Sequence, residues 1–202
     1  LLPTAFALER ILPAFPALLK KWPKLGVDLV LDDFADVATE TGADVAVRLV
    51  DGEDVASDEM RELAPVPMAL VGAAAYIQTA SAPTAPHDLA FHNCLALARP
   101  LTETTWRLKG AGGVHEIRVT GSLQVNSLEA LLAAVRAGIG LALLPRDVVA
   151  DDLASGDLVT VLDGYVPASW SLAAVRSAGE SPPARVRAIL DLLTEAMREP
   201  GK

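Results

Sequence analysis

Cysteine is nearly absent from this chain of 202 residues, in which Cys94 is the single one. One cysteine excludes an intramolecular disulfide, and its position relative to His87, His92 and His115 matches no recognised metal-ligand spacing. We therefore expect no bound metal, and a reducing compartment is the simplest setting for the lone thiol.

Long hydrophobic runs are missing as well. The most apolar stretch, residues 128–145, contains Glu129 and Arg136 and is interrupted by glycines, so it does not predict a membrane span. No signal peptide is visible, which favours a cytoplasmic protein that makes no contact with a membrane. The chain opens with Leu1 inside an apolar run rather than with Met, and we expect an amino-terminal portion to precede it in a longer protein.

Positive charge is scarce: 17 lysines and arginines face 26 aspartates and glutamates, which gives a formal charge of −9. Such a surface repels a phosphate backbone, so we do not expect this chain to bind DNA by itself. Hydrophobic residues make up 51% and charged residues 21%, a balance that suits a globular α/β protein. The length allows one large domain or two small lobes with a real core.

Catalytic and cofactor motifs are also lacking. No GxSxG segment is present, and Ser122 and Ser127 have no histidine near them in the sequence. The glycine-rich residues 110–113 lie between two expected strands and lack the lysine of a phosphate loop, so they predict a hairpin turn. We expect no cofactor and no enzyme, although a small α/β enzyme stays open as a rival because spatial neighbours of the serines are not known at this point.

Alternating strands and helices are predicted in the first third of the chain. Apolar residues at three- and four-residue spacing indicate an amphipathic helix over residues 8–22, which Pro23 ends. A strand at 27–31, a helix at 33–41 and a strand at 43–49 follow. This order predicts a mostly parallel sheet with helices on its faces.

The rest of the chain predicts a second group of elements. We expect a strand at 67–73, an antiparallel hairpin within 105–121, a helix at 128–136 that Asn126 or Ser127 caps, and a strand that ends at 145. Strands at 158–162 and 170–175 and a closing helix at 184–197 complete the prediction.

Several polar residues stand where ligands bind in open α/β sheets, at the carboxyl ends of strands. Asp32 follows the strand at 27–31, and Arg48 lies at the end of the strand at 43–49. Thr4, Asn126 and Ser127 stand at helix starts, where unpaired backbone N–H groups can bind an anion. Helix capping is the alternative for these three residues, and a surface ion pair is the alternative for Arg48.

Eight segments in this order resemble the effector-binding domain of LysR-type transcriptional regulators. They are PTAFALERILPAFPALLKKWP, VDLVLDD followed by GADVAVRL, LVGAAAYI, APHDLAFHNCL, TTWRL, GSLQVNSLEALLAAVRAGIGLALLP, LASGDLVTVL and SPPARVRAILDLL. Each segment is a weak signal alone, but together they cover the chain from end to end.

The resemblance implies an α/β fold of two Rossmann-like lobes, similar to type 2 periplasmic binding proteins, with a ligand cleft between the lobes. Residues 1–66 and 169–202 would form the first lobe and residues 67–168 the second. Family members also carry an amino-terminal winged helix-turn-helix and a linker helix that bind DNA, which this chain does not contain.

The resemblance also implies which residues line the cleft. By position they are Thr4, Ala5, Asp32, Arg48, the loop around Thr102, Asn126 and Ser127. The family often has a serine after the first strand where this chain has Thr4, Ala5 and Phe6, so the usual hydroxyl donor is moved or absent. We favour a small organic acid or hydroxylated metabolite over a bare inorganic anion.

We thus expect a domain that senses a small-molecule effector, forms a homodimer or higher homo-oligomer, and contacts DNA only through the missing helix-turn-helix domain. The resemblance implies that the helix at 8–22 packs against a second subunit. The alternative is a free-standing periplasmic-type solute-binding protein, which would share the two lobes but act as a monomer behind a signal peptide.

Overall fold

The computed structural model describes residues 1–33, 42–51, 60–98, 103–167, 170–176 and 183–198. The chain divides into two compact units, each with its own core. Unit 1 consists of Leu1–Pro65 and Trp170–Lys202, and unit 2 consists of Val66–Ser169.

Unit 1 begins with a continuous helical run made of α1 (Thr4–Phe6), the π-helix η1 (Ala7–Ile11) and α2 (Leu12–Lys21). The predicted helix at 8–22 is confirmed, although it starts four residues earlier. In the π-turn, the N–H of Leu12 bonds to the carbonyl of Ala7. This wide turn stands directly before Pro13, where the proline ring cannot donate to the regular ladder.

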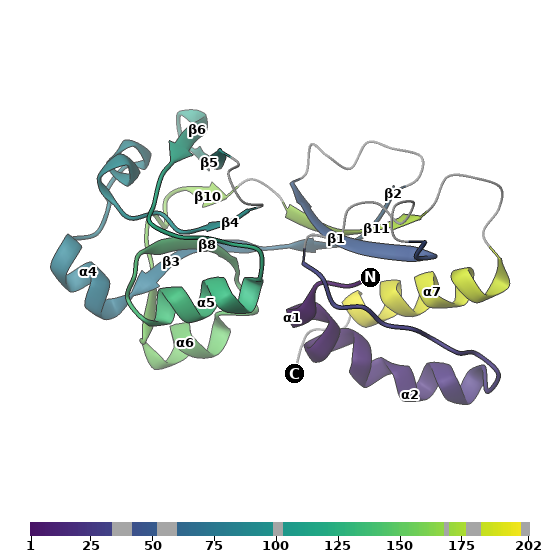
Figure 1. Ribbon diagram of the computed structural model, residues 1–202. Helices are drawn as coiled ribbons and strands as arrows, with labels where there is room; N and C mark the ends of the chain where they lie inside the picture. Colours follow the sequence, from purple (N-terminus) through teal and green to yellow (C-terminus); the bar gives the residue numbers. More distant parts are fainter. Residues whose placement is uncertain (34–41, 52–59, 99–102, 168–169, 177–182, 199–202) are drawn as a thin grey trace. The chain divides into compact units, whose positions relative to one another are not determined.

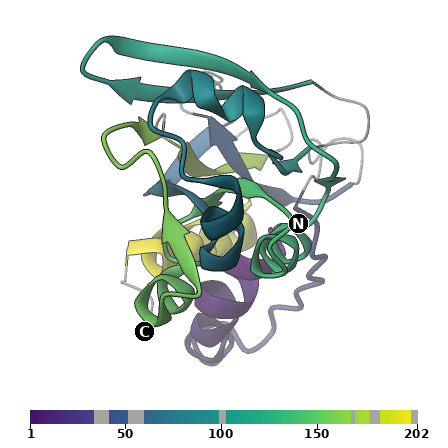
Figure 2. The same ribbon diagram turned by 90° about the vertical axis from the view of Figure 1, so that its left-hand side faces the viewer.

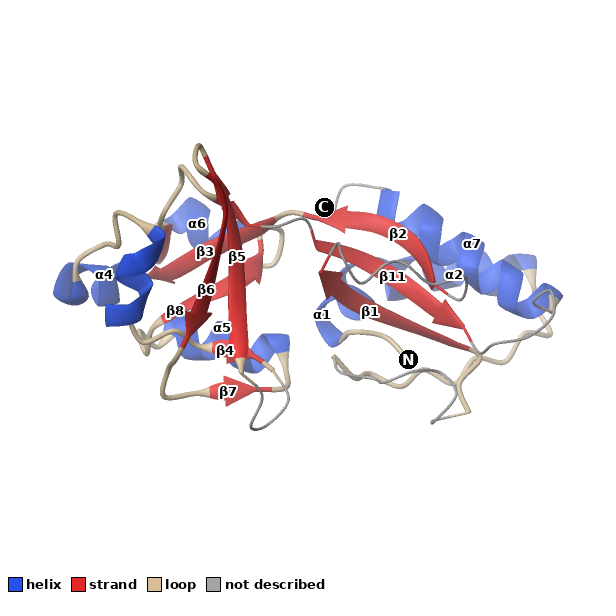
Figure 3. Cartoon of the chain, turned by 90° about the horizontal axis from the view of Figure 1, so that it is seen from above, coloured by secondary structure: helices blue, strands red, loops and turns tan. Residues whose placement is uncertain are grey.

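The sheet of unit 1 combines strands from both ends of the chain. β1 (Val45–Asp51) pairs antiparallel with β11 (Trp170–Arg176), and β2 (Met60–Val66) lies on the other side of β11. Figure 3 shows these three strands side by side. Among the described residues, the expectation of parallel neighbours is met at the amino end, where Leu2 and Leu31 form a parallel bridge and Leu1 bonds to Val45 and Val47 of β1 in the parallel pattern. It is not met between β1 and β11, which are antiparallel, so the predicted mostly parallel sheet is correct only in part.

The core of unit 1 lies between this sheet and two helices. α7 (Ala184–Arg198) confirms the predicted closing helix and lies on the same side of the sheet as α2 (Figure 1). Ile11, Val47, Leu172 and Leu193 are fully or almost fully buried there. The predicted helix at 33–41 falls almost entirely outside the described residues.

Unit 2 is built around β3 (Met68–Ala73), which pairs antiparallel with β8 (Leu141–Pro145) and with β9 (Leu158–Thr160). β4 (Ala96–Leu97) and β7 (Gln124–Val125) form a parallel pair. The remaining elements are α4 (Ala74–Ala80), the 3-10 helix η2 (Pro86–Phe91), α5 (Leu128–Arg136), α6 (Ala150–Ser155) and β10 (Val166–Pro167).

The predicted hairpin is confirmed as β5 (Thr104–Gly110) and β6 (Gly113–Val119), which Figure 2 shows along the top of unit 2. α5 has the predicted bounds. Ser127 caps its start, and Gly138, with a φ of 73°, follows its end. This positive φ is one that glycine adopts without strain.

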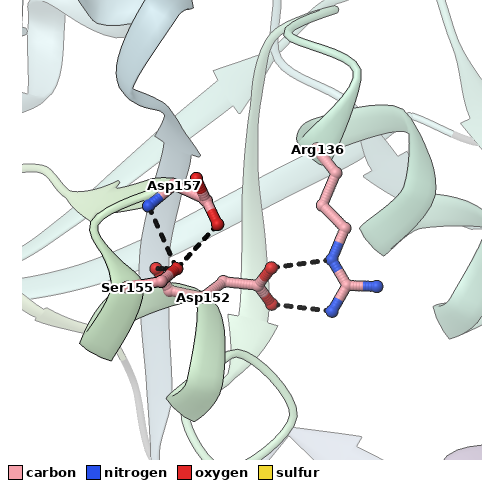
Figure 4. Close-up of polar contacts among 4 residues, drawn as sticks. All are labelled: Arg136, Asp152, Ser155 and Asp157. Atoms are coloured by element: carbon pink, nitrogen blue, oxygen red, sulfur yellow. Dashed lines mark hydrogen bonds and ion pairs between the residues drawn. The ribbon is translucent and has the colours of Figure 1, made fainter.

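An ion pair connects α5 and α6 in unit 2. The guanidinium of Arg136 donates two hydrogen bonds of 2.8 Å, from Nε and Nη2, to the two carboxylate oxygens of Asp152 (Figure 4). The paired carboxylate raises the pKa of Arg136. Ser155, one turn further on, donates its hydroxyl to Asp157 at 2.7 Å, so this corner carries a structural network rather than a site.

Candidate functional site

The start of the first helix in unit 1 is closed by a carboxylate. The backbone N–H of Thr4 donates to Oδ1 of Asp33 at 2.7 Å. We expected this N–H to be open to a ligand anion. The structure differs because Asp33 closely follows Leu31, which forms a parallel bridge with Leu2 in the extended segment 1–3. Asp33 is half-buried, and the sequence interpretation had selected its neighbour Asp32 instead.

The other predicted residues of unit 1 lie on the same few segments. Ala5 is buried in the first helical turn. Asp32 is exposed, and its backbone N–H donates to the carbonyl of Leu2 at 2.9 Å. Arg48 is half-buried in the middle of β1, one residue beyond Val47, whose N–H bonds to the carbonyl of Leu1 at 2.8 Å. Asp32 and Arg48 thus stand on or next to segments that pair with Leu1 and Leu2, although Arg48 lies inside β1 and not at the strand end that the sequence predicted.

Two predicted residues of unit 2 lie together at the start of α5. The hydroxyl of Ser127 accepts the N–H of Ala130 at 3.3 Å and donates to Oε2 of Glu129 at 3.0 Å. Helix capping, one of the two interpretations, is thus the role that Ser127 has in this structure. Asn126 stands exposed directly before it.

Thr102 lies outside the described residues, but Thr104 nearby has a feature that sequence reasoning missed. Its Oγ1 is a buried side-chain oxygen without a hydrogen-bond partner among the described residues. Leaving a hydroxyl unsatisfied costs about 1–3 kcal/mol, so such an atom marks a place where a water or ligand is expected. No local pattern in the sequence indicates this feature, because it depends on how the hydroxyl is packed.

The histidines and the cysteine have local partners. His92 lies 3.3 Å from the hydroxyl of Tyr76, the ring of His115 contacts Tyr165, and His87 lies 3.3 Å from Asp88. Burial raises the pKa of Cys94 to about 12. Among the described residues, no group of three or more histidine, cysteine, aspartate or glutamate side chains could hold a metal ion. The helices of the same residues are all too short or too polar to span a membrane.

Known proteins match almost the whole length of this chain. A family model described as the LysR substrate binding domain matches residues 2–198. Among curated relatives, the probable HTH-type transcriptional regulator LtrA of Klebsiella pneumoniae is 28% identical over 191 residues, 92% of this chain. The HTH-type transcriptional regulator PgrR of Escherichia coli K12 is 33% identical over 160 residues, 78% of this chain.

Solved structures show the same fold. The regulatory domain of CrgA from Neisseria meningitidis, a LysR-type transcriptional regulator, has a TM-score of 0.75 at 22% identity and covers 97% of this chain and 96% of its own. The full-length Vibrio cholerae virulence activator AphB has a TM-score of 0.73 at 23% identity and covers 97% of this chain and 66% of its own.

Fold and matches together define a class, the two-lobe α/β domains that resemble periplasmic binding proteins. Within this class the chain belongs to the LysR substrate binding domain family, the effector-binding domain of LysR-type transcriptional regulators. The free-standing solute-binding protein is not favoured, since these relatives are transcriptional regulators. The chain spans 60% of LtrA and 53% of PgrR.

Proposed function

We propose that this chain is the effector-sensing part of a cytoplasmic regulator that binds a small metabolite. The residues proposed for this contact are Thr4, Ala5, Asp32, Arg48, Thr102, Asn126 and Ser127, and we add Asp33 and Thr104. The hydrogen bond between Thr4 and Asp33 is the observation that carries the proposal, because it orients a carboxylate at a helix start.

The geometry favours a ligand that donates hydrogen bonds as well as carrying negative charge. Asp33 closes one helix start, and Glu129 is bonded to Ser127 at the other. At either helix start a bare anion would be repelled by the carboxylate, whereas a hydroxyl group can donate to it. Arg48 supplies a guanidinium whose donors suit a carboxylate. We therefore propose a small hydroxylated organic acid as the effector.

The proposed role involves no chemistry on the ligand. Effector binding would shift the arrangement of lobes or subunits and so alter how the DNA-binding domains of the whole protein meet their operator. The chain alone has a charge of −9, so it should give no mobility shift with DNA at physiological salt. A shift at micromolar concentration of this chain would contradict the assignment of DNA binding to the missing domain.

We further propose that the chain forms a homodimer through the surface of unit 1. Large apolar side chains on the first helical run and directly after it are exposed to solvent, among them Leu8 at 53%, Leu19 at 43% and Trp22 at 44%. Exposed apolar patches of this kind mark interaction surfaces, and two-fold pairing is the commonest oligomer. Sedimentation that shows only a 21.1 kDa species at high micromolar concentration would contradict the dimer.

The effector is testable by a thermal-shift screen of organic acids with and without hydroxyl groups, followed by calorimetry. Arg48→Ala should cost about 1.5–3 kcal/mol of binding and Ser127→Ala about 0.5–1.5 kcal/mol. Arg187→Ala and Ser155→Ala are matched controls at exposed positions of α7 and α6, and they should bind as the wild type does. Unchanged affinity in both test variants would place the ligand elsewhere, and a cationic effector would overturn the electrostatic argument.

A further inference from the structure

A groove in unit 1 lies between the end of α2 and the start of α7, which run side by side (Figure 1). It consists of two adjoining hollows of about 430 Å³ and about 250 Å³, and Trp22 and Ala188 line both of them. Small side chains leave this space, because Ala17 and Ala188 reach less far than larger residues would. We call it the α2–α7 groove.

The wall of the larger hollow is apolar and includes an exposed aromatic ring. Pro23 stands directly after Trp22, where the chain leaves α2. In the turn that follows, the N–H of Leu25 donates to the carbonyl of Trp22 at 3.0 Å, and Trp22, Pro23 and Leu25 line the hollow together. Tryptophan is among the residue types that most often anchor protein interfaces, so this wall is suited to an apolar side chain of a partner.

Positive charge is concentrated around the same tryptophan. The chain contains five lysines, and three of them, Lys20, Lys21 and Lys24, stand within two positions of Trp22. Lys21 lines the smaller hollow and Lys24 the larger one. None of the three makes an ion pair with a described residue. Lysines in the last turn of a helix offset its dipole, but Lys24 lies beyond α2, so that role does not account for it.

Negative charge lies further along α7. Asp191 and Glu195 line the smaller hollow, and Asp191 is paired with Arg61 at 3.9 Å. A phosphate backbone placed along the groove would be repelled by these carboxylates and would leave the apolar hollow unfilled. A peptide avoids both costs if it is acidic where it meets the lysines and apolar where it meets Trp22.

We propose that the α2–α7 groove binds an acidic, amphipathic segment of a partner protein. An apolar side chain of this segment occupies the larger hollow against Trp22, and its carboxylates approach Lys21 and Lys24. Charge complementarity decides the kind of partner, because this cationic corner stands on a chain whose formal charge is −9. Lysine stems cover apolar surface while their charged heads stay in water, so the same side chains serve both contacts.

The groove lies on a different side of α2 from Leu19, which belongs to the surface proposed for the homodimer. Successive residues of an α-helix are about 100° apart around its axis, so Leu19 lies about 160° from Lys21. Trp22 belongs to both surfaces, and the test therefore includes the oligomeric state. None of the residues proposed for the effector lines the groove, so this inference goes beyond the proposed function and is independent of it.

The experiment uses a fluorescein-labelled twelve-residue peptide of glutamates and leucines, with the leucines at helical spacing, titrated with the 202-residue chain. Two matched peptides replace all glutamates by glutamine or all leucines by serine. The acidic peptide should saturate in anisotropy below about 200 μM chain, and each control peptide should bind at least about tenfold more weakly. No saturation by the acidic peptide in this range, or equal binding of the three peptides, would overturn the proposal.

Substitutions locate the site on the chain. Lys24→Glu should weaken binding of the acidic peptide about fivefold, and Trp22→Ala at least about tenfold. Lys109→Glu makes the same charge change at an exposed position of β5 and should weaken binding less than about twofold. Equal losses in Lys24→Glu and Lys109→Glu would show that the peptide senses only the net charge and would refute the groove as its site.

Two other occupants of the groove would give results of their own. If a second copy of the chain fills it, Lys24→Glu changes the sedimentation of the chain without peptide. If nucleic acid fills it, a short DNA duplex displaces the acidic peptide, and Lys24→Glu weakens the binding of that duplex. Either result would replace the acidic segment as the occupant. No effector is added in any of these measurements, so their failure leaves the proposed function as it stands.

Discussion

The carboxylate of Asp33 accepts the backbone N–H of Thr4 and so occupies the first turn of a helical run that extends to Lys21. A side chain from a turn distant in the sequence thus performs the role that the residue before a helix performs elsewhere, and Pro3, which stands there, makes no such side-chain bond. A ligand that binds at this helix start meets an acceptor rather than a donor.

Asp33→Ala should destabilise the chain by about 0.5–2 kcal/mol, because it leaves the Thr4 N–H without its acceptor. Asp33→Asn keeps a side-chain oxygen and should lose clearly less. Urea unfolding of the three chains measures the difference, and an Asp33→Ala variant as stable as the wild type would show that water replaces the carboxylate at no cost.

Two glycines of unit 2 stand against the backbone of Asn93 and Cys94. A Cβ on Gly140 would overlap the carbonyl oxygen of Asn93, and one on Gly121 would overlap that of Cys94. Gly140→Ala and Gly121→Ala should each cost about 3 kcal/mol, since neither backbone oxygen can move aside easily. Gly112→Ala, whose nearest neighbour would be His115 at 3.8 Å, is the matched control and should change stability by no more than about 0.5 kcal/mol.

Cys94 should resist modification as long as unit 2 is folded. Its side chain is 2% exposed, and burial raises its pKa to about 12, so very little thiolate is present at pH 8. Iodoacetamide should alkylate the native chain at least about 100-fold more slowly than the chain in urea. Similar rates in the two states would mean that unit 2 opens readily around β4.

Asp88 should contribute to stability only above acidic pH. Its Oδ2 accepts the N–H and the hydroxyl of Thr84 and the N–H of Ala85, and these bonds lower its pKa from 3.8 to about 2. A carboxyl with a lowered folded pKa stabilises the fold above its unfolded pKa and loses that contribution as the pH falls toward about 2. Tm measured between pH 5 and pH 2 should therefore fall less in Asp88→Asn than in the wild type.

Thr84→Ala should lie between these two chains in the same titration, because it removes the hydroxyl bond to Asp88 and keeps the two backbone bonds. Parallel curves for the wild type and Asp88→Asn would show that other carboxyls set the acid limit of this protein.

Local sequence patterns predict those helices and strands whose ends are marked by capping or turn residues. The bounds of α5 follow from apolar spacing between Ser127, which caps it, and Gly138, which ends the turn. β2 escaped prediction because Arg61, Glu62 and Pro65 interrupt its alternation, which an outer strand of the sheet tolerates. The antiparallel register of β1 with β11 depends on residues far apart in the chain, and no local pattern encodes it.

In the candidate site, too, some features follow from local sequence and others depend on residues that are far apart in the chain. Helix starts at Thr4 and Ser127 could be located from the sequence, since each follows a strand. Which of two adjacent aspartates bonds to Thr4 could not, because a strand directs successive side chains to opposite faces and the register of Leu2 with Leu31 decides between them. The unsatisfied hydroxyl of Thr104 depends on packing in three dimensions and has no sequence signal.

The assembly of unit 1 from both ends of the chain has a consequence for biosynthesis. Its strand β1 leaves the ribosome about 120 residues before its partner β11, which at about 5–20 residues per second means roughly 6–24 seconds without that partner. Glu62 and Ser171, joined by a 2.6 Å hydrogen bond in this sheet, are separated by 109 positions. Unit 2 is continuous in sequence and is synthesised within that interval, so the nascent chain exposes the apolar strand β1 to chaperones until unit 2 has been made.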